Sequence, residues 1–236
     1  MFSIDDLRMP TRDGEEIGVR VYQPKEPSWA QPSGALLFFR GGGFTVGSVQ
    51  THDALCRKFA QDADCAVVSV DYRLAPEHKF PVAVNNAFDA LQWLVREAAT
   101  LGIDPARIAV GGDSAGGTLA TVCATLARDA NIALRLQMLI YPGTSAWQKT
   151  ASHARLAEGY LLSADTIQWF FAQYVRDARD RDDWRFAPLD AAAGVPVTLM
   201  RYEGMIHEFF KMGGFVPDVA AAHADAVSAL REALQE

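Results

Sequence analysis

Alternating stretches of apolar and polar residues predict a chain in which strands and helices follow one another. Residues 17–22 alternate between the two kinds, as in a strand with one exposed face, and the Asp13-Gly14 pair before them indicates a hairpin over residues 9–22 at a sheet edge. Residues 35–39 and 65–70 are continuous apolar runs, which is typical of strands covered on both faces. The other expected strands are residues 108–110, 136–141 and 195–202, and the expected helices are residues 51–62, 82–101, 115 onward, 163–176 and 217–234.

The order of these elements predicts the fold class. Strands alternate with helices through the first 141 residues, which indicates an α/β fold with a mostly parallel central sheet flanked by helices. A chain of 236 residues, 50% of them hydrophobic, can bury one large core, so we expect a single domain over residues 1–236. The alternation stops between residues 143 and 188, where we expect a lid-like helical insertion.

The turn between the strand at residues 108–110 and the following helix has the sequence Gly112-Asp113-Ser114-Ala115-Gly116, a G-x-S-x-G pattern. In a nucleophile elbow the serine sits on a very tight turn, so the residues two before and two after it must be small. The helix amino terminus would then face any negative charge that develops at Ser114. The other interpretation is a glycine-rich turn that binds phosphate or nothing, but the lysine of a phosphate-binding loop is absent.

Two further stretches offer partners for Ser114. Residues 41–43 are three glycines directly after a buried strand, a pattern that lets backbone N–H groups line an oxyanion hole, although such a stretch can also be a plain flexible turn. His207 follows the expected strand at residues 195–202, where a hydrolase of this architecture presents its general base.

The aromatic residues of the insertion allow two interpretations. Trp169, Phe170, Phe171 and Tyr174 lie on one expected helix, with Ser163 as its cap. They either line an apolar acyl or alcohol pocket above the serine or pack as an ordinary core.

Charge and cysteine content narrow the class of partner. The net charge is −7 and no basic cluster occurs, so we expect no nucleic acid partner. The three cysteines show no metal-ligand spacing and lie in apolar surroundings, which predicts buried reduced thiols and no metal site. We find neither a signal-peptide pattern nor an 18-residue apolar stretch, and we therefore expect a cytoplasmic protein without a membrane span.

Four motifs together resemble those of the bacterial hormone-sensitive-lipase-like esterases of the α/β hydrolase superfamily. They are residues 40–44 (RGGGF), 71–78 (DYRLAPEH), 112–117 (GDSAGG) and 202–207 (YEGMIH), and the resemblance covers nearly the whole chain from about residue 9. It implies a serine carboxylesterase acting on small-molecule esters with short acyl chains, without metal or organic cofactor. It further implies Ser114 as nucleophile, His207 as base, and an oxyanion hole formed by the N–H groups of Gly42, Gly43 and Ala115.

The chain departs from the family in three places. Arg40 stands where the family's loop normally begins with histidine, and we expect its hydrogen bonds to anchor the loop. We expect the family's amino-terminal helical cap to be missing. The family also carries its triad acid after a strand that precedes the final strand, and that strand–helix unit, roughly 25 to 30 residues, has no counterpart before residue 195.

The missing unit leaves the triad acid open. Asp182, Asp183 and Glu208 are candidates, and Asp190 is the first of them because it precedes the final expected strand. The alternative to an esterase is an impaired hydrolase fold that binds acyl ligands or a partner. An exposed sheet edge left by the missing strand would also favour a homodimer.

Overall fold

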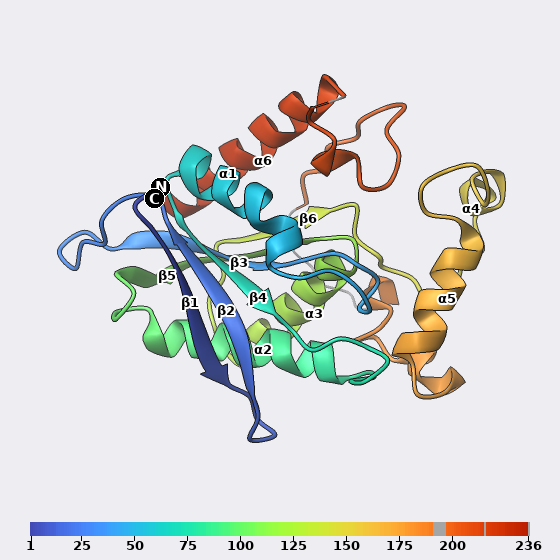
Figure 1. Cartoon of the computed structure of the whole chain (residues 1–236), viewed down its shortest axis with the longest axis horizontal. Coiled ribbons are helices and arrows are strands. Elements are labelled where there is room, and N and C mark those ends of the chain that lie inside the picture. The colour runs from blue at the N-terminus through green and yellow to red at the C-terminus, as the bar shows by residue number, and fades with distance from the viewer. Residues whose placement is uncertain (191–196, 215, 236) are drawn as a thin grey trace.

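A six-stranded sheet forms the centre of the molecule in the computed structural model, which describes residues 1–190, 197–214 and 216–235 (Figure 1). In chain order the strands are β1 (Ser3–Pro10), β2 (Glu16–Gln23), β3 (Ser33–Phe39), β4 (Ala66–Asp71), β5 (Ile103–Asp113) and β6 (Leu136–Ile140). They lie side by side in the order β1-β2-β4-β3-β5-β6. β4, β3, β5 and β6 are parallel to one another. β2 pairs antiparallel with β4 and with β1, and β1 and β2 form a hairpin on the edge. The mostly parallel sheet expected from the sequence is therefore confirmed.

β3 lies at the middle of the parallel strands because both of its faces are apolar. Ala35 is in register with Ala66 of β4 on one side and with Ile108 of β5 on the other. Every β3 residue after Ser33 is buried. Parallel pairing brings the carboxyl ends of β3, β5 and β6 to one edge of the sheet, and α/β folds bind ligands at that edge. The glycine loop follows β3 there, and Ser114 follows β5.

Helices cover both faces of the sheet. α1 and α6 lie on one face, and α2 and α3 lie on the other (Figure 1). Each face has its own cluster of buried apolar side chains, with Leu36 and Phe38 pointing to the first and Leu37 and Phe39 to the second. The helices are α1 (Asp53–Ala63), α2 (Val82–Glu97), α3 (Ala115–Asp129), α4 (Ala151–Arg155), α5 (Ala164–Tyr174) and α6 (Asp218–Gln235). Short 3₁₀ turns occur at η1 (Gln50–His52), η2 (Ala178–Asp182), η3 (Pro188–Asp190) and η4 (Phe209–Lys211).

Residues 143–188 carry two helices that project from the sheet. α4 has no buried residue, and in α5 only Tyr174 is buried. Figure 1 shows both helices to one side of the sheet, beyond the carboxyl ends of its parallel strands. This segment thus stands above the edge where Ser114 lies.

The strand expected at residues 195–202 is wrong for its described part. Residues 195 and 196 lie outside the described residues, and residues 197–200 have no regular structure. Val197 is 80% exposed and Leu199 is 83% exposed. A strand needs a neighbour to receive its backbone hydrogen bonds, and these residues pair with none of the described strands. β6 consequently forms the edge of the described sheet, and the homodimer that such an edge would favour stays a prediction.

Two smaller outcomes concern a helix end and the thiols. The helix expected to reach residue 101 ends at Glu97, and the next four residues form turns before Gly102, whose φ is +65°. Cys56, Cys65 and Cys123 are free and buried, as expected. Burial raises the pKa of Cys56 and Cys65 to about 12, so both remain thiols at neutral pH.

None of the described helices is long and apolar enough to cross a membrane.

Candidate active site

Ser114 occupies a strained turn between β5 and α3. Its φ of 52° and ψ of −119° lie in a region that residues with side chains rarely adopt. The backbone holds it there because the Ser114 N–H donates to Ile140 O over 2.9 Å and its carbonyl accepts from the N–H groups of Thr118 and Gly143. The turn also requires glycine at 116, since a Cβ there would lie 1.8 Å from Phe39 O. This geometry is that of the elbow expected from the sequence.

His207 reaches Ser114 from 93 residues further along the chain. Its Nε2 lies 2.8 Å from Ser114 Oγ. The imidazole packs against the ring of Tyr141, with 4.7 Å between the ring centroids. Burial lowers the pKa of His207, and the nearby Lys211 lowers it further, although Glu208 and Asp113 oppose the shift. A neutral imidazole at this distance can accept the hydroxyl proton.

The glycine loop after β3 is tied directly to the serine turn. The Gly41 N–H donates to Asp113 Oδ1 over 2.8 Å, so the residue before Ser114 holds the start of the loop. Gly42 has a φ of +118°, and a Cβ there would meet Val46 O at 2.0 Å. Within the described residues, the N–H groups of Gly42, Gly43 and Ala115 donate no hydrogen bond. These three donors are therefore available to a ligand.

Arg40 anchors the loop from the other side, as expected. Its side chain is only 1% exposed, and its Nη1 donates to Val46 O over 3.0 Å. The guanidinium also lies over the ring of Tyr72 at 4.4 Å, while the Tyr72 hydroxyl donates to Arg40 O over 2.8 Å. The loop is thus fixed by Asp113 at one end and by Arg40 at the other.

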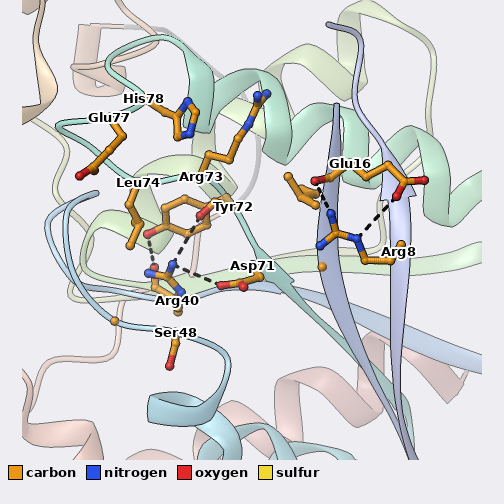
Figure 2. A pocket seen from close by; sticks show the side chains of 13 residues that line it. Arg8, Glu16, Arg40, Ser48, Asp71, Tyr72, Arg73, Leu74, Glu77 and His78 are labelled. Carbon is orange, nitrogen blue, oxygen red and sulfur yellow. Dashed lines mark hydrogen bonds and ion pairs between the residues drawn. The ribbon is translucent and has the colours of Figure 1, made fainter. Parts of the chain in front are cut away.

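A surface hollow of about 460 Å³ lies behind this loop (Figure 2). Asp71, Arg73 and Glu77 line it together with Arg40, but neither Ser114 nor His207 does. Arg73 pairs with Asp13 at 2.6 Å, and Asp71 faces Arg40 at 3.6 Å. This region supports the loop from outside and is separate from the nucleophile.

A second set of charged residues surrounds the serine, and most of it was not identified from the sequence. Asp113 is fully buried; its Oδ2 lies 3.2 Å from His52 Nε2 and 3.8 Å from Lys211 Nζ. Burial by itself would raise the pKa of Asp113, but the hydrogen bonds and charges of these neighbours hold it below its ordinary value. Lys211 also pairs with Glu208, whose Oε1 lies 3.9 Å from His207 Nε2.

The candidates for the triad acid lie at different places. His207 Nδ1 has no hydrogen-bond partner among the described residues. Asp183 pairs with Arg185 at 2.6 Å, and Asp182 is exposed. Asp190 ends the turn η3, but its side chain lies outside the described part of the structure. Of the three candidates whose side chains the structure describes, Glu208 alone is found beside His207.

The chain is similar to several esterases over almost its whole length. It is 40% identical to an ethyl acetate hydrolase of Pseudomonas putida over 98% of this chain and 83% of that protein. It is 37% identical to the carboxylesterase NlhH of Mycobacterium tuberculosis over 98% of this chain and 84% of that protein. Among solved structures it matches the thermostable carboxylesterase EstE1, cloned from a metagenomic library, with a TM-score of 0.93 and 36% identity over 99% of this chain and 90% of that one.

The match to the Pseudomonas enzyme also bears on the missing strand–helix unit. It runs over 264 positions, although this chain has only 236 residues, so at least 28 of those positions have no counterpart here. That number fits the size of the unit that the sequence lacks before residue 195.

The family comparison agrees with the fold. A family model described as the α/β hydrolase fold matches residues 36–192, which include the glycine loop and Ser114. The chain belongs to the hormone-sensitive-lipase-like esterases of the α/β hydrolase superfamily.

Proposed function

We propose that the chain hydrolyses carboxylic esters with short acyl chains, using Ser114 as nucleophile and His207 as general base. That it is an ester hydrolase follows from its family and from its similarity to named carboxylesterases. The single observation that carries the residue assignment is the 2.8 Å contact between His207 Nε2 and Ser114 Oγ. Nucleophile and base must be within hydrogen-bond reach, and this pair is.

The proposed reaction has two halves. As Ser114 Oγ bonds to the ester carbonyl carbon, its proton moves to His207 Nε2, and the protonated imidazole then gives that proton to the departing alkoxide. Water next attacks the acyl-serine carbonyl and passes its proton to Nε2, which returns it to Oγ as the acid leaves. The products are one carboxylic acid and one alcohol, and no cofactor is needed.

The glycine loop supplies the proposed oxyanion hole. Gly42, Gly43 and Ala115 have N–H groups that donate no hydrogen bond within the described residues, and Asp113 links the loop to the serine turn. Donors that are already in place stabilise a developing oxyanion without reorganising, and one such donor contributes on the order of 10²-fold to kcat or more.

We assign the segment over residues 143–188 to the acyl or alcohol pocket. A Cβ on Gly43 would meet the ring of Phe170 at 2.4 Å, so α5 lies directly against the proposed oxyanion loop. Tyr174 stacks on Phe44 of the same loop at 4.1 Å. Of the two interpretations of these aromatic residues, core packing therefore applies to Tyr174, and lining of the pocket applies to Phe170, which faces the loop. The name of the Pseudomonas relative supports a small acyl group.

The first test is hydrolysis of p-nitrophenyl acetate and butyrate by the Ser114→Ala variant. We expect turnover to fall at least 10⁴-fold, because Ser114 Oγ is the only hydroxyl among the described residues that hydrogen-bonds His207. Ser228→Ala, an exposed position on α6, is the matched control and should keep full activity. Turnover that survives Ser114→Ala would refute the assignment.

The same assay separates the esterase from an impaired hydrolase fold. An esterase releases p-nitrophenol continuously after the first turnover. A burst of one equivalent followed by no turnover would instead show acylation without hydrolysis of the acyl-serine, which is the behaviour of the impaired fold.

A further inference from the structure

His207, which must carry a proton during the proposed reaction, has no carboxylate hydrogen-bonded to its ring among the described residues. An imidazolium in a partly buried site needs a nearby negative charge. None of the described residues hydrogen-bonds Nδ1, where a serine hydrolase normally places its carboxylate. Among the described residues, the stabilising charge must therefore come from another direction.

Glu208 is the carboxylate that the chain turns toward this site. Its backbone has a φ of 73°, the left-handed conformation that is uncommon for a residue with a side chain. Its Oε1 lies 3.9 Å from His207 Nε2, and its side chain is only 22% exposed. At that distance the carboxylate is too far to hydrogen-bond the ring, so it attracts the charge without removing the proton that the leaving group needs.

Asp113 does not replace Glu208 in this role. Its Oδ1 accepts the Gly41 N–H and its Oδ2 contacts His52. Both oxygens are therefore used to hold the glycine loop and the turn η1. Glu208, by contrast, has Lys211 as its one cationic side-chain partner within the described residues apart from His207 itself.

Lys211 sets the orientation of Glu208 and limits its effect. Its ammonium pairs with the Glu208 carboxylate and lies 3.8 Å from Asp113 Oδ2 and 3.4 Å from His52 Nε2. One cation between two carboxylates keeps their combined charge from opposing the oxyanion that would form beside Ser114.

We infer that Glu208 is a positioning residue that stabilises the positive charge on His207, and that Lys211 holds its carboxylate in place. The inference rests on the proposed esterase function. The charged groups that face His207 are Glu208, Asp113 and Lys211, and the phenol of Tyr141, whose pKa burial raises further above its ordinary value, stays neutral beside the ring. Glu208 and Lys211 should therefore shift the titration of His207 in opposite directions.

The direct test is an NMR titration of the histidine ring signals, with the His207 signal assigned by its loss in His207→Ala. Glu208→Gln removes a negative charge, so the midpoint of His207 should fall by about half to one pH unit. Lys211→Gln removes a positive charge, so the midpoint should rise by a similar amount. Glu203→Gln, an exposed glutamate whose partner is Arg201, is the matched control and should leave the midpoint unchanged.

Kinetics then test whether the charge serves the reaction. Glu208→Gln should lower kcat for p-nitrophenyl acetate about tenfold with KM almost unchanged, and Glu208→Asp should recover part of the loss. Circular dichroism checks that each variant is folded. An unchanged midpoint, or a kcat within twofold of the original, would overturn the inference.

Asp190 provides the competing outcome. If Asp190→Asn lowers kcat far more than Glu208→Gln does, the stabilising charge belongs to Asp190 and the inference is wrong. Failure of the esterase proposal looks different, because it would appear as turnover that survives Ser114→Ala or as no turnover in the unchanged protein. In the second case the NMR midpoints still decide whether Glu208 acts on His207.

Discussion

Arg40 shows at the scale of one residue how a buried charge can support the proposed oxyanion loop. Its guanidinium donates to Val46 O and also lies 3.4 Å from Tyr72 O, so it joins the loop after β3 to the loop after β4. Figure 2 shows that Asp71 and Tyr72 approach the same guanidinium. A planar group with several donors in fixed directions can bind all of these partners at once, which an ammonium cannot.

Replacing Arg40 therefore tests the anchor. Arg40→Met should lower kcat about tenfold with a smaller change in KM, because the proposed oxyanion donors lose their fixed position. It should also lower the free energy of unfolding by roughly 1–3 kcal/mol, since Val46 O and Tyr72 O lose a donor. Arg40→Lys should give a kcat and a free energy of unfolding between those of Arg40→Met and of the original protein. Arg8→Met, on the exposed rim of the same hollow, is the control, and an equal loss in that variant would contradict the anchor.

At the scale of elements, α5 connects the projecting segment to the site. The contact between Phe170 and the glycine loop predicts that this side chain limits the space for the acyl chain. Phe170→Ala should shift the preference of kcat/KM from acetate toward butyrate and hexanoate esters by about tenfold, a rough figure for opening space in an apolar pocket. Trp169→Ala, at an exposed neighbouring position, should change the preference little. An unaltered ratio in Phe170→Ala would place the acyl chain elsewhere.

The sequence predicted those elements whose stability is decided by their own residues and their neighbours in the chain. The apolar runs of β3 and β4 and the tight serine turn are of this kind. The alternating residues near 195–202 gave a wrong prediction because a strand also needs a partner, and pairing depends on residues far away in the chain. His52 and Lys211 were missed for the same reason, since they come near Asp113 only in the folded protein.

At the scale of the whole molecule, ionisable groups couple stability to pH. Burial lowers the pKa of His207 and of His223. His223 lies on α6, where its Nε2 contacts Phe210 O of η4 and its Nδ1 has no partner in the described structure. The unfolded chain then binds protons more readily than the folded one below about pH 6.5, so stability falls as the pH falls. Asp13, whose pKa the hydrogen bonds of Thr11 and Arg73 lower to about 2, adds a further loss between about pH 4 and 2.

Urea unfolding at several pH values measures this effect. The free energy of unfolding should be roughly 1 kcal/mol lower at pH 5.5 than at pH 7.5. His223→Gln should reduce that difference, whereas His78→Gln, at an exposed loop position, should leave it unchanged. Stability that rises on acidification to pH 5.5 would show that these histidines are charged in the native state.

The hydrogen bond from the Gly41 amide to Asp113 joins two of the proposed catalytic segments, the glycine loop and the serine turn, and leaves His207 on a third. Because this bond ties the glycine loop to the turn of Ser114, a small shift of the sheet moves the Ser114 hydroxyl and the loop amides together and preserves their spacing. The imidazole of His207 belongs to a separate segment, and residues 197–202 before it adopt no regular structure. In a redesign of this protein, the segment over residues 197–202, which precedes His207, is therefore the first one to make more rigid.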